Sequence, residues 1–251
     1  MRAAALARLK PGWYLLIALL VYAVVVSVLL ARASGRAQAA EALAAAASSE
    51  AAALEASDPL PSAASPGLWF PIPGARLPAS DDNLPGAPRA YRHGVSQGFD
   101  FYDGDAGVPV SYGTPVVAAA DGQVVRADLG YTEMDPRAWE VLMADVSEAG
   151  ADEEQLDRLR GRQVWIRTQD GTVLRYGHLA SVRSGLRTGS NVYRGQVIGY
   201  VGNSGTDRAV AGGQDGARLR FEIWEEGGDF FGAGLDATAV RLAASALFVG
   251  P

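Results

Sequence analysis

Runs of alternating hydrophobic and polar residues begin at about Arg89 and recur through the rest of the chain. Such alternation, with glycine-rich turns between the runs, is typical of short antiparallel strands. The runs are residues 114–118, 123–127, 163–168, 172–176, 195–201 and 218–224. Asp121-Gly122 separates the first two runs and Asp170-Gly171 the next two, which predicts two β-hairpins. The pattern predicts a mainly β fold, a compact antiparallel sandwich or barrel.

Helical periodicity interrupts these strands once. Asp135 and Pro136 form a typical N-cap and first turn, and a second helix is predicted after Gly150, over residues 152–159. The apolar stripe of the first helix is Trp139, Leu142, Met143 and Val146. We interpret residues 133–161 as a helical insertion, either a hairpin packed on the sheet or a partner-binding lid beside a groove.

A second helical pattern lies near the C-terminus, over residues 236–248. Its apolar residues available for packing are Val240, Leu242, Ala243, Ala246 and Leu247. We expect a structural helix that closes the domain.

The N-terminal part of the chain has a different composition. Residues 13–31 carry no charge and are rich in Leu, Val and Ala, which predicts a single transmembrane helix in the cell membrane. Basic residues precede this run, which favours a cytoplasmic N-terminus of residues 1–12 and an exported body, in the periplasm or at the cell surface. A cleaved signal peptide is the alternative, because Ala37-Gln38-Ala39 is a small-x-small site.

Residues 32–88 are expected to separate this segment from the folded domain, residues 89–251. Residues 34–56 are dominated by alanine, which predicts a helical stalk or a low-complexity spacer. Residues 59–88 are rich in Pro, Gly, Ser and Ala, as linkers are. Within them, Leu68–Pro73 is apolar and is expected to pack on the domain as its first strand.

Charge and cysteine content limit the possible partners of the chain and the ways in which its fold can be stabilised. The net charge of −6 argues against nucleic acid as a partner. The chain has no cysteine, so an exported domain must be stable without disulfides.

Three motifs indicate a family. They are Ser96-Gln97-Gly98-Phe99-Asp100, Tyr176-Gly177-His178-Leu179 and Arg218-Leu219-Arg220-Phe221-Glu222. In this order, and with the phrases at 113–116, 120–122 and 195–199, they resemble the lysostaphin-type (LytM-like) zinc metallopeptidases over roughly residues 89–229. The resemblance implies a compact β-sheet metallopeptidase core and a role at the peptide cross-bridges of bacterial cell walls.

The family's zinc positions are altered in this chain. The resemblance implies His-x-Gly-x-Asp for the first motif and His-Leu-His-Phe-Glu for the last, with zinc ligands at the positions of Ser96, Asp100 and Arg220. A catalytic zinc site needs about three protein ligands, and a guanidinium cannot be one. The chain has only two histidines, so a conventional site with several His or Cys ligands cannot be assembled. We therefore expect no metal and no cofactor.

The resemblance also places Arg220 beside Asp100, and we predict a salt bridge between them in the former metal position. In one alternative, Arg218 and Arg220 cover the solvent face of an edge strand. In another, His93 joins Asp100 and His178 in an unusual metal site. We favour a solvated turn for His93.

His178 is the retained histidine of Tyr-x-His-Leu, which in active relatives stabilises the oxyanion. Without a metal, we interpret it as a vestigial catalytic residue or a residue of the binding groove. Residues 202–206 lack the lysine and following helix of a phosphate loop, which favours a β-turn beside the groove. The predicted groove residues are Ser96, Asp100, Tyr176, His178, Arg218 and Arg220.

Three functions fit these observations. The first is a membrane-anchored, non-catalytic binding or regulatory module of peptidoglycan metabolism, with peptidoglycan or a cell-wall hydrolase as its partner. The second is an active zinc endopeptidase that cleaves peptidoglycan cross-bridges. The third is a structural scaffold in the cell wall. We favour the first, because two of the three metal positions hold residues that are not zinc ligands.

Overall fold

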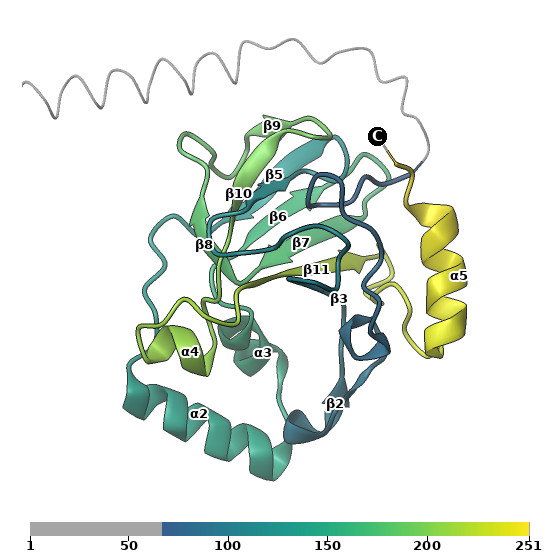
Figure 1. Cartoon of the computed structure of the whole chain (residues 1–251). Helices are drawn as coiled ribbons and strands as arrows, with labels where there is room; N and C mark the ends of the chain where they lie inside the picture. Colours follow the sequence, from purple (N-terminus) through teal and green to yellow (C-terminus); the bar gives the residue numbers. More distant parts are fainter. Residues whose placement is uncertain (1–66, 251) are drawn as a thin grey trace, which may run out of the picture. The chain divides into compact units, whose positions relative to one another are not determined.

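The computed structural model describes residues 67–250 (Figure 1). The predicted cytoplasmic N-terminus, transmembrane helix and stalk lie outside the described residues. Within residues 67–250, no helix has the length and hydrophobicity needed to cross a membrane.

Antiparallel sheets form the framework of the described residues, which confirms the prediction of a mainly β fold. A six-stranded sheet has the order β3 (Phe99–Tyr102), β11 (Arg218–Trp224), β7 (Val173–Gly177), β6 (Val164–Arg167), β5 (Gly122–Ala127) and β9 (Asn191–Val192). A three-stranded sheet has the order β4 (Pro115–Val117), β10 (Val197–Val201) and β8 (Leu179–Val182). β1 (Pro88–Arg89) and β2 (Gly94–Val95) form a separate pair.

One of the two predicted hairpins is present. β6 and β7 pair across Asp170-Gly171, and the Asp170 carboxylate accepts hydrogen bonds from Thr168 and Thr172. The hairpin predicted across Asp121-Gly122 is wrong, because β4 pairs with β10 whereas β5 pairs with β6 and β9. The Asp121 carboxylate accepts a hydrogen bond from the backbone of Arg194, so it joins a distant loop instead of closing a local turn.

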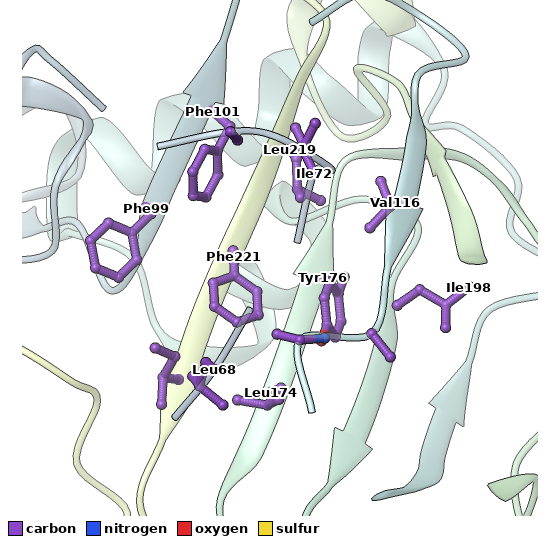
Figure 2. Packing of buried hydrophobic residues seen from close by; sticks show 14 of the residues in the cluster. Leu68, Ile72, Phe99, Phe101, Val116, Leu174, Tyr176, Ile198, Leu219 and Phe221 are labelled. Carbon is purple, nitrogen blue, oxygen red and sulfur yellow. The ribbon is translucent and has the colours of Figure 1, made fainter. Parts of the chain in front are cut away.

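The hydrophobic core contains residues of both large sheets, such as Phe99, Phe221 and Ile198 (Figure 2). Leu68 and Ile72 are buried in the same cluster, so the packed body begins before the boundary predicted at residue 89. The prediction that Leu68–Pro73 packs on the domain is confirmed, but only Leu68 makes a β-bridge, to Phe248. The prolines in this segment have no backbone N–H with which to extend a strand.

The helices of the described residues are η1 (Asp81–Asn83), η2 (Ala90–Arg92), α2 (Pro136–Ala149), α3 (Glu153–Leu159), α4 (Asp207–Val210) and α5 (Ala237–Leu247). The Asp135 carboxylate caps α2, and Asp152 with Gln155 forms a capping box on α3, as the sequence indicates. The main contacts of α2 are with η2 and α4, and Figure 1 shows α2 beside α4 and not on either large sheet, so the predicted packing of this helix on the sheet is wrong.

The C-terminal helix begins after the cap at Asp236, in agreement with the prediction. Its buried residues are Val240 and Ala244, and Phe248 follows in the core. Leu242, predicted to pack, is 76% exposed, because it lies on the opposite face of the helix from Val240 and Ala244.

Candidate functional site

A pocket of about 570 Å³ lies where β3, β11 and the loop after β7 meet the helical insertion. Its polar lining includes Asp100, His178, Arg218 and Arg220, four of the six predicted groove residues. Trp139 and Met143 of α2 also line it, so this helix forms a wall of the pocket. The turn at Gly205 is another wall, as expected for a turn beside the groove, although the short helix α4 follows it.

The strand register places Asp100 opposite Arg220, on the neighbouring strands β3 and β11. Arg220 Nη1 lies 2.9 Å from Asp100 Oδ2, which confirms the predicted salt bridge. β11 lies between β3 and β7, so the alternative of an edge strand with solvent-facing arginines is wrong. Arg220 itself is 7% exposed.

Asp100 is an ionised carboxylate among three arginines. Besides Arg220, Arg89 Nη2 donates to Oδ2 at 3.1 Å, and Arg218 Nε lies 3.7 Å from Oδ1. Burial by itself raises the pKa of Asp100, but the positive charges of Arg220 and Arg218 outweigh burial and lower it to about 2.

A second buried carboxylate, Glu222, holds the other side of Arg220. Glu222 Oε1 accepts from Arg220 Nε and Arg160 Nε, each at 3.0 Å, and Oε2 accepts from Trp224 Nε1 at 2.9 Å. Burial raises the pKa of Glu222, and the two arginines outweigh it and lower the pKa to about 2. Both carboxylates in turn raise the pKa of Arg220 against the effect of its burial. The guanidinium is thus permanently charged and fixed in place.

Ser96 is fully buried and belongs to the same network. Its hydroxyl donates to the carbonyl of Gly98 at 2.9 Å and accepts from Arg220 Nη1 at 3.0 Å. Ser96 therefore helps to hold the arginine, but it does not line the pocket.

Both ring nitrogens of His178 are engaged. Nδ1 lies 2.8 Å from the carbonyl oxygen of Ser204, which can only accept, so Nδ1 carries the proton. Nε2 then accepts from Arg218 Nη2 at 2.8 Å. Burial and the charge of Arg218 lower the pKa of His178 to about 3, so the ring is neutral near pH 7. Its φ of 58° is left-handed and aims the ring at the pocket from the end of β7.

Tyr176 was predicted in the groove, and this prediction is wrong. The side chain is fully buried among Phe221 and Leu174 in the hydrophobic core (Figure 2), and its hydroxyl accepts from the backbone of Ala119 at 2.8 Å. The alternation of β7 carries the signal that places it there, because Leu174 and Tyr176 share one face and Arg175 the other.

His93 is exposed at the end of η2 with a φ of 53°, as expected for a solvated turn residue. It lines a neighbouring cavity and not the pocket that holds Asp100 and His178. Across residues 67–250, no group of three or more His, Cys, Asp or Glu side chains is placed to hold a metal ion.

Sequence reasoning missed several residues of the site. Arg160 comes from the end of α3, and it also donates to Gln97 Oε1 at 2.6 Å. Arg89 precedes η2, Arg92 is the last residue of η2, and both line the pocket. Glu222 lies within the last motif but was not predicted as a site residue. The three arginines lie outside the motifs and reach the pocket through the tertiary fold, which no local pattern predicts.

Comparison with known proteins finds a family that part of the chain resembles. Residues 142–231 match the sequence model of peptidase family M23, a span that includes His178, Arg218 and Arg220 but not the first motif. No curated protein matches the sequence.

Similar solved structures include a zinc-containing peptidase from Vibrio cholerae, at 19% identity and a TM-score of 0.42. That match covers 68% of this chain and 39% of the Vibrio chain. The catalytic domain of EnpA, a prophage-encoded M23 protein of Enterococcus faecalis, has 19% identity and a TM-score of 0.39. That match covers 64% of this chain and 92% of the EnpA chain. A chain of the SpoIIQ–SpoIIIAH pore-forming complex has 18% identity and a TM-score of 0.41, and the match covers 71% of this chain and 98% of that one. Residues 142–231, which carry the second and third motifs, are therefore similar to the LytM-like peptidases of family M23.

Proposed function

We propose that this domain is a non-catalytic binding or regulatory module of peptidoglycan metabolism, in which a salt bridge takes the place of the family's zinc. The observation that carries the proposal is the contact of 2.9 Å between Arg220 and Asp100. A guanidinium held there by Asp100, Glu222 and Ser96 repels a divalent cation and occupies the acceptor atoms that a cation needs.

The residues of the pocket do not fit zinc. Asp100 is the single family ligand that this chain retains, and its Oδ2 already accepts from two arginines. The Nε2 atom of His178 accepts from Arg218, so the histidine offers no free lone pair to a metal or an oxyanion. We derive no hydrolytic step for this pocket.

The placement of the domain is part of the same proposal. The uncharged run at residues 13–31 supports a membrane anchor with the domain on the exported side, where peptidoglycan and its hydrolases are the available partners.

The zinc content of the chain, and of a variant with restored metal ligands, tests the proposal. We expect the purified chain to hold no stoichiometric zinc and to leave peptidoglycan uncleaved. The variant Ser96→His/Arg218→His/Arg220→His restores the family's motifs and is expected to bind about one zinc per chain. Adding Asp100→Ala to that variant should abolish zinc binding, which serves as the matched control.

Stoichiometric zinc in the unaltered chain, lost in Asp100→Ala, would overturn the proposal in favour of an active endopeptidase. Co-sedimentation of the chain with purified peptidoglycan, and its capture by cell-wall hydrolases, then test the binding role. If neither partner is retained, the scaffold function replaces the binding function.

A further inference from the structure

Arg92 is a buried arginine without an acidic partner. It is 9% exposed, and it lines the pocket from the end of η2. Nη2 donates to the carbonyl of Val95, whereas Nε has no hydrogen-bond partner. No carboxylate of residues 67–250 forms an ion pair with it, and its burial lowers its pKa. An unpaired buried charge is costly, and an anion in the pocket would offset that cost.

Arg218 is the second cation with unused donors. Its Nη2 atom donates to His178, but Nε has no hydrogen-bond partner, because Asp100 Oδ1 at 3.7 Å is too distant. Asp100 Oδ2 accepts from both Arg220 and Arg89, and a single carboxylate balances only one of these positive charges. Positive charge therefore exceeds negative charge in the floor of the pocket.

The rest of the pocket limits what kind of anion fits. Trp139 and Met143 of α2 and Leu159 of α3 form an apolar wall. Asp82 and Asp207 line the pocket as well and are exposed, so a ligand with several negative charges would meet repulsion there. A volume of about 570 Å³ lies in the usual range for small-ligand pockets. A monoanion with an adjoining apolar group matches these features.

We propose that the pocket binds a peptide carboxylate, with Arg92 and Arg218 as its cationic partners and the wall at Trp139 and Met143 against the neighbouring apolar side chain. This inference rests on the proposed binding function and names the ligand class of the same pocket. Arginine is suited to this role because its planar guanidinium donates two parallel hydrogen bonds to a carboxylate.

Matched peptides test the carboxylate. The probes are acetyl-Ala-Ala-Leu as the free acid, the same peptide as its carboxamide, and acetyl-Ala-Asp-Leu carboxamide, whose carboxylate is internal. Isothermal calorimetry with the full chain should show that at least one carboxylate peptide binds about tenfold or more tightly than the neutral carboxamide. The difference between the two carboxylate peptides tells whether a chain terminus or an acidic side chain is recognised.

Variants then test the arginine. Arg92→Gln should reduce the affinity for the preferred carboxylate peptide to that for the neutral peptide. Arg137→Gln, an exposed arginine on α2 outside the pocket lining, should leave both affinities unchanged. If Arg92→Gln does not fold, the salt dependence of the unaltered chain replaces it, because added salt should weaken the carboxylate peptide and not the neutral one.

Equal affinity for carboxylate and neutral peptides, or no binding of either class, would overturn the inference. So would an Arg92→Gln variant that folds and keeps the full preference. These results leave the proposed function standing if the chain still co-sediments with peptidoglycan or captures a hydrolase and holds no zinc. Stoichiometric zinc in the unaltered chain would overturn the proposed function, whatever affinities the peptides show.

Discussion

Arg220 donates to three acceptors in the floor of the pocket, Ser96, Asp100 and Glu222. Two of them are carboxylates buried with it, so the guanidinium balances charge that water cannot reach. Breaking a buried ion pair by removing one partner leaves the other charge uncompensated, which costs far more than losing a surface pair.

We therefore predict that Arg220→Leu lowers the free energy of unfolding by about 3–5 kcal/mol. The control is Arg208→Leu, which removes an arginine that is 62% exposed beside Asp207 and Asp215 and should cost at most about 0.5 kcal/mol. Urea unfolding of both variants measures the difference. A loss of less than about 1 kcal/mol in Arg220→Leu would mean that the buried network is not charged as described.

At the scale of elements, the close pairing of β3 with β11 positions the site. Gly98 precedes β3, and a Cβ atom there would lie 2.3 Å from the carbonyl oxygen of Phe221 and 2.7 Å from Glu222 Cγ. The glycine of the first motif thus allows the strand that carries Asp100 to approach the strand that carries Arg220. This requirement is one of packing and does not depend on zinc.

Gly98→Ala should accordingly destabilise the domain by about 2 kcal/mol or more, because one backbone must move away from the other. Gly130→Ala is the matched control, since no atom lies within 4 Å of the added Cβ and its φ is not positive. Thermal unfolding compares the two variants. A Gly98→Ala variant as stable as the control would show that β3 and β11 can separate at little cost.

The helical insertion illustrates how one element serves two purposes. Of its apolar stripe, Leu142 and Val146 are buried, whereas Trp139 and Met143 line the pocket. A single hydrophobic face thus anchors α2 and supplies the wall of the pocket. The alternative interpretation of the insertion as an element beside the groove agrees with this position better than packing on the sheet does.

For the molecule as a whole, lowering the pH should reduce the free energy of unfolding, first through His178 and then through Asp100 and Glu222. The pKa of His178 is about 3 in the folded state, so below pH 6.5 the unfolded chain binds a proton that the folded chain does not. The free energy of unfolding is therefore highest above pH 6.5. Below that pH, it decreases by up to about 1.4 kcal/mol for each unit by which the pH is lowered. Asp100 and Glu222, with pKa values of about 2, add to the loss below their unfolded values near pH 4.

The measurement is the urea midpoint at pH 7, 5.5 and 4. In His178→Asn, the loss between pH 7 and 5.5 should largely disappear, because asparagine does not titrate and tolerates a left-handed φ. His93→Asn is the control, since it changes the other histidine of the chain, which is exposed, and it should keep the loss. Equal pH dependence in both variants would contradict a neutral, buried His178.

The sequence by itself determined the helix caps and the strands β4 to β7, β10 and β11, because capping residues and alternation are local properties that each stretch of chain carries. The contact between Asp100 and Arg220 was predicted from the resemblance to a known family, which places the two motifs side by side. The sequence also carried the prediction that zinc ligands are lost, since residue types alone exclude an arginine from coordination. The buried position of Tyr176 could have been predicted from the same alternation.

Only the tertiary structure decided that β4 pairs with β10 and that Arg92 is buried without a carboxylate partner. The hydrogen bonds from Arg160 to Glu222 and from Arg218 to His178 were likewise decided by the tertiary structure. These contacts join residues far apart in the sequence, and the turns between them are compatible with other pairings. Which partners meet depends on the packing of the whole core, which minimises buried polar groups over all strands at once, and no single stretch of chain contains that information.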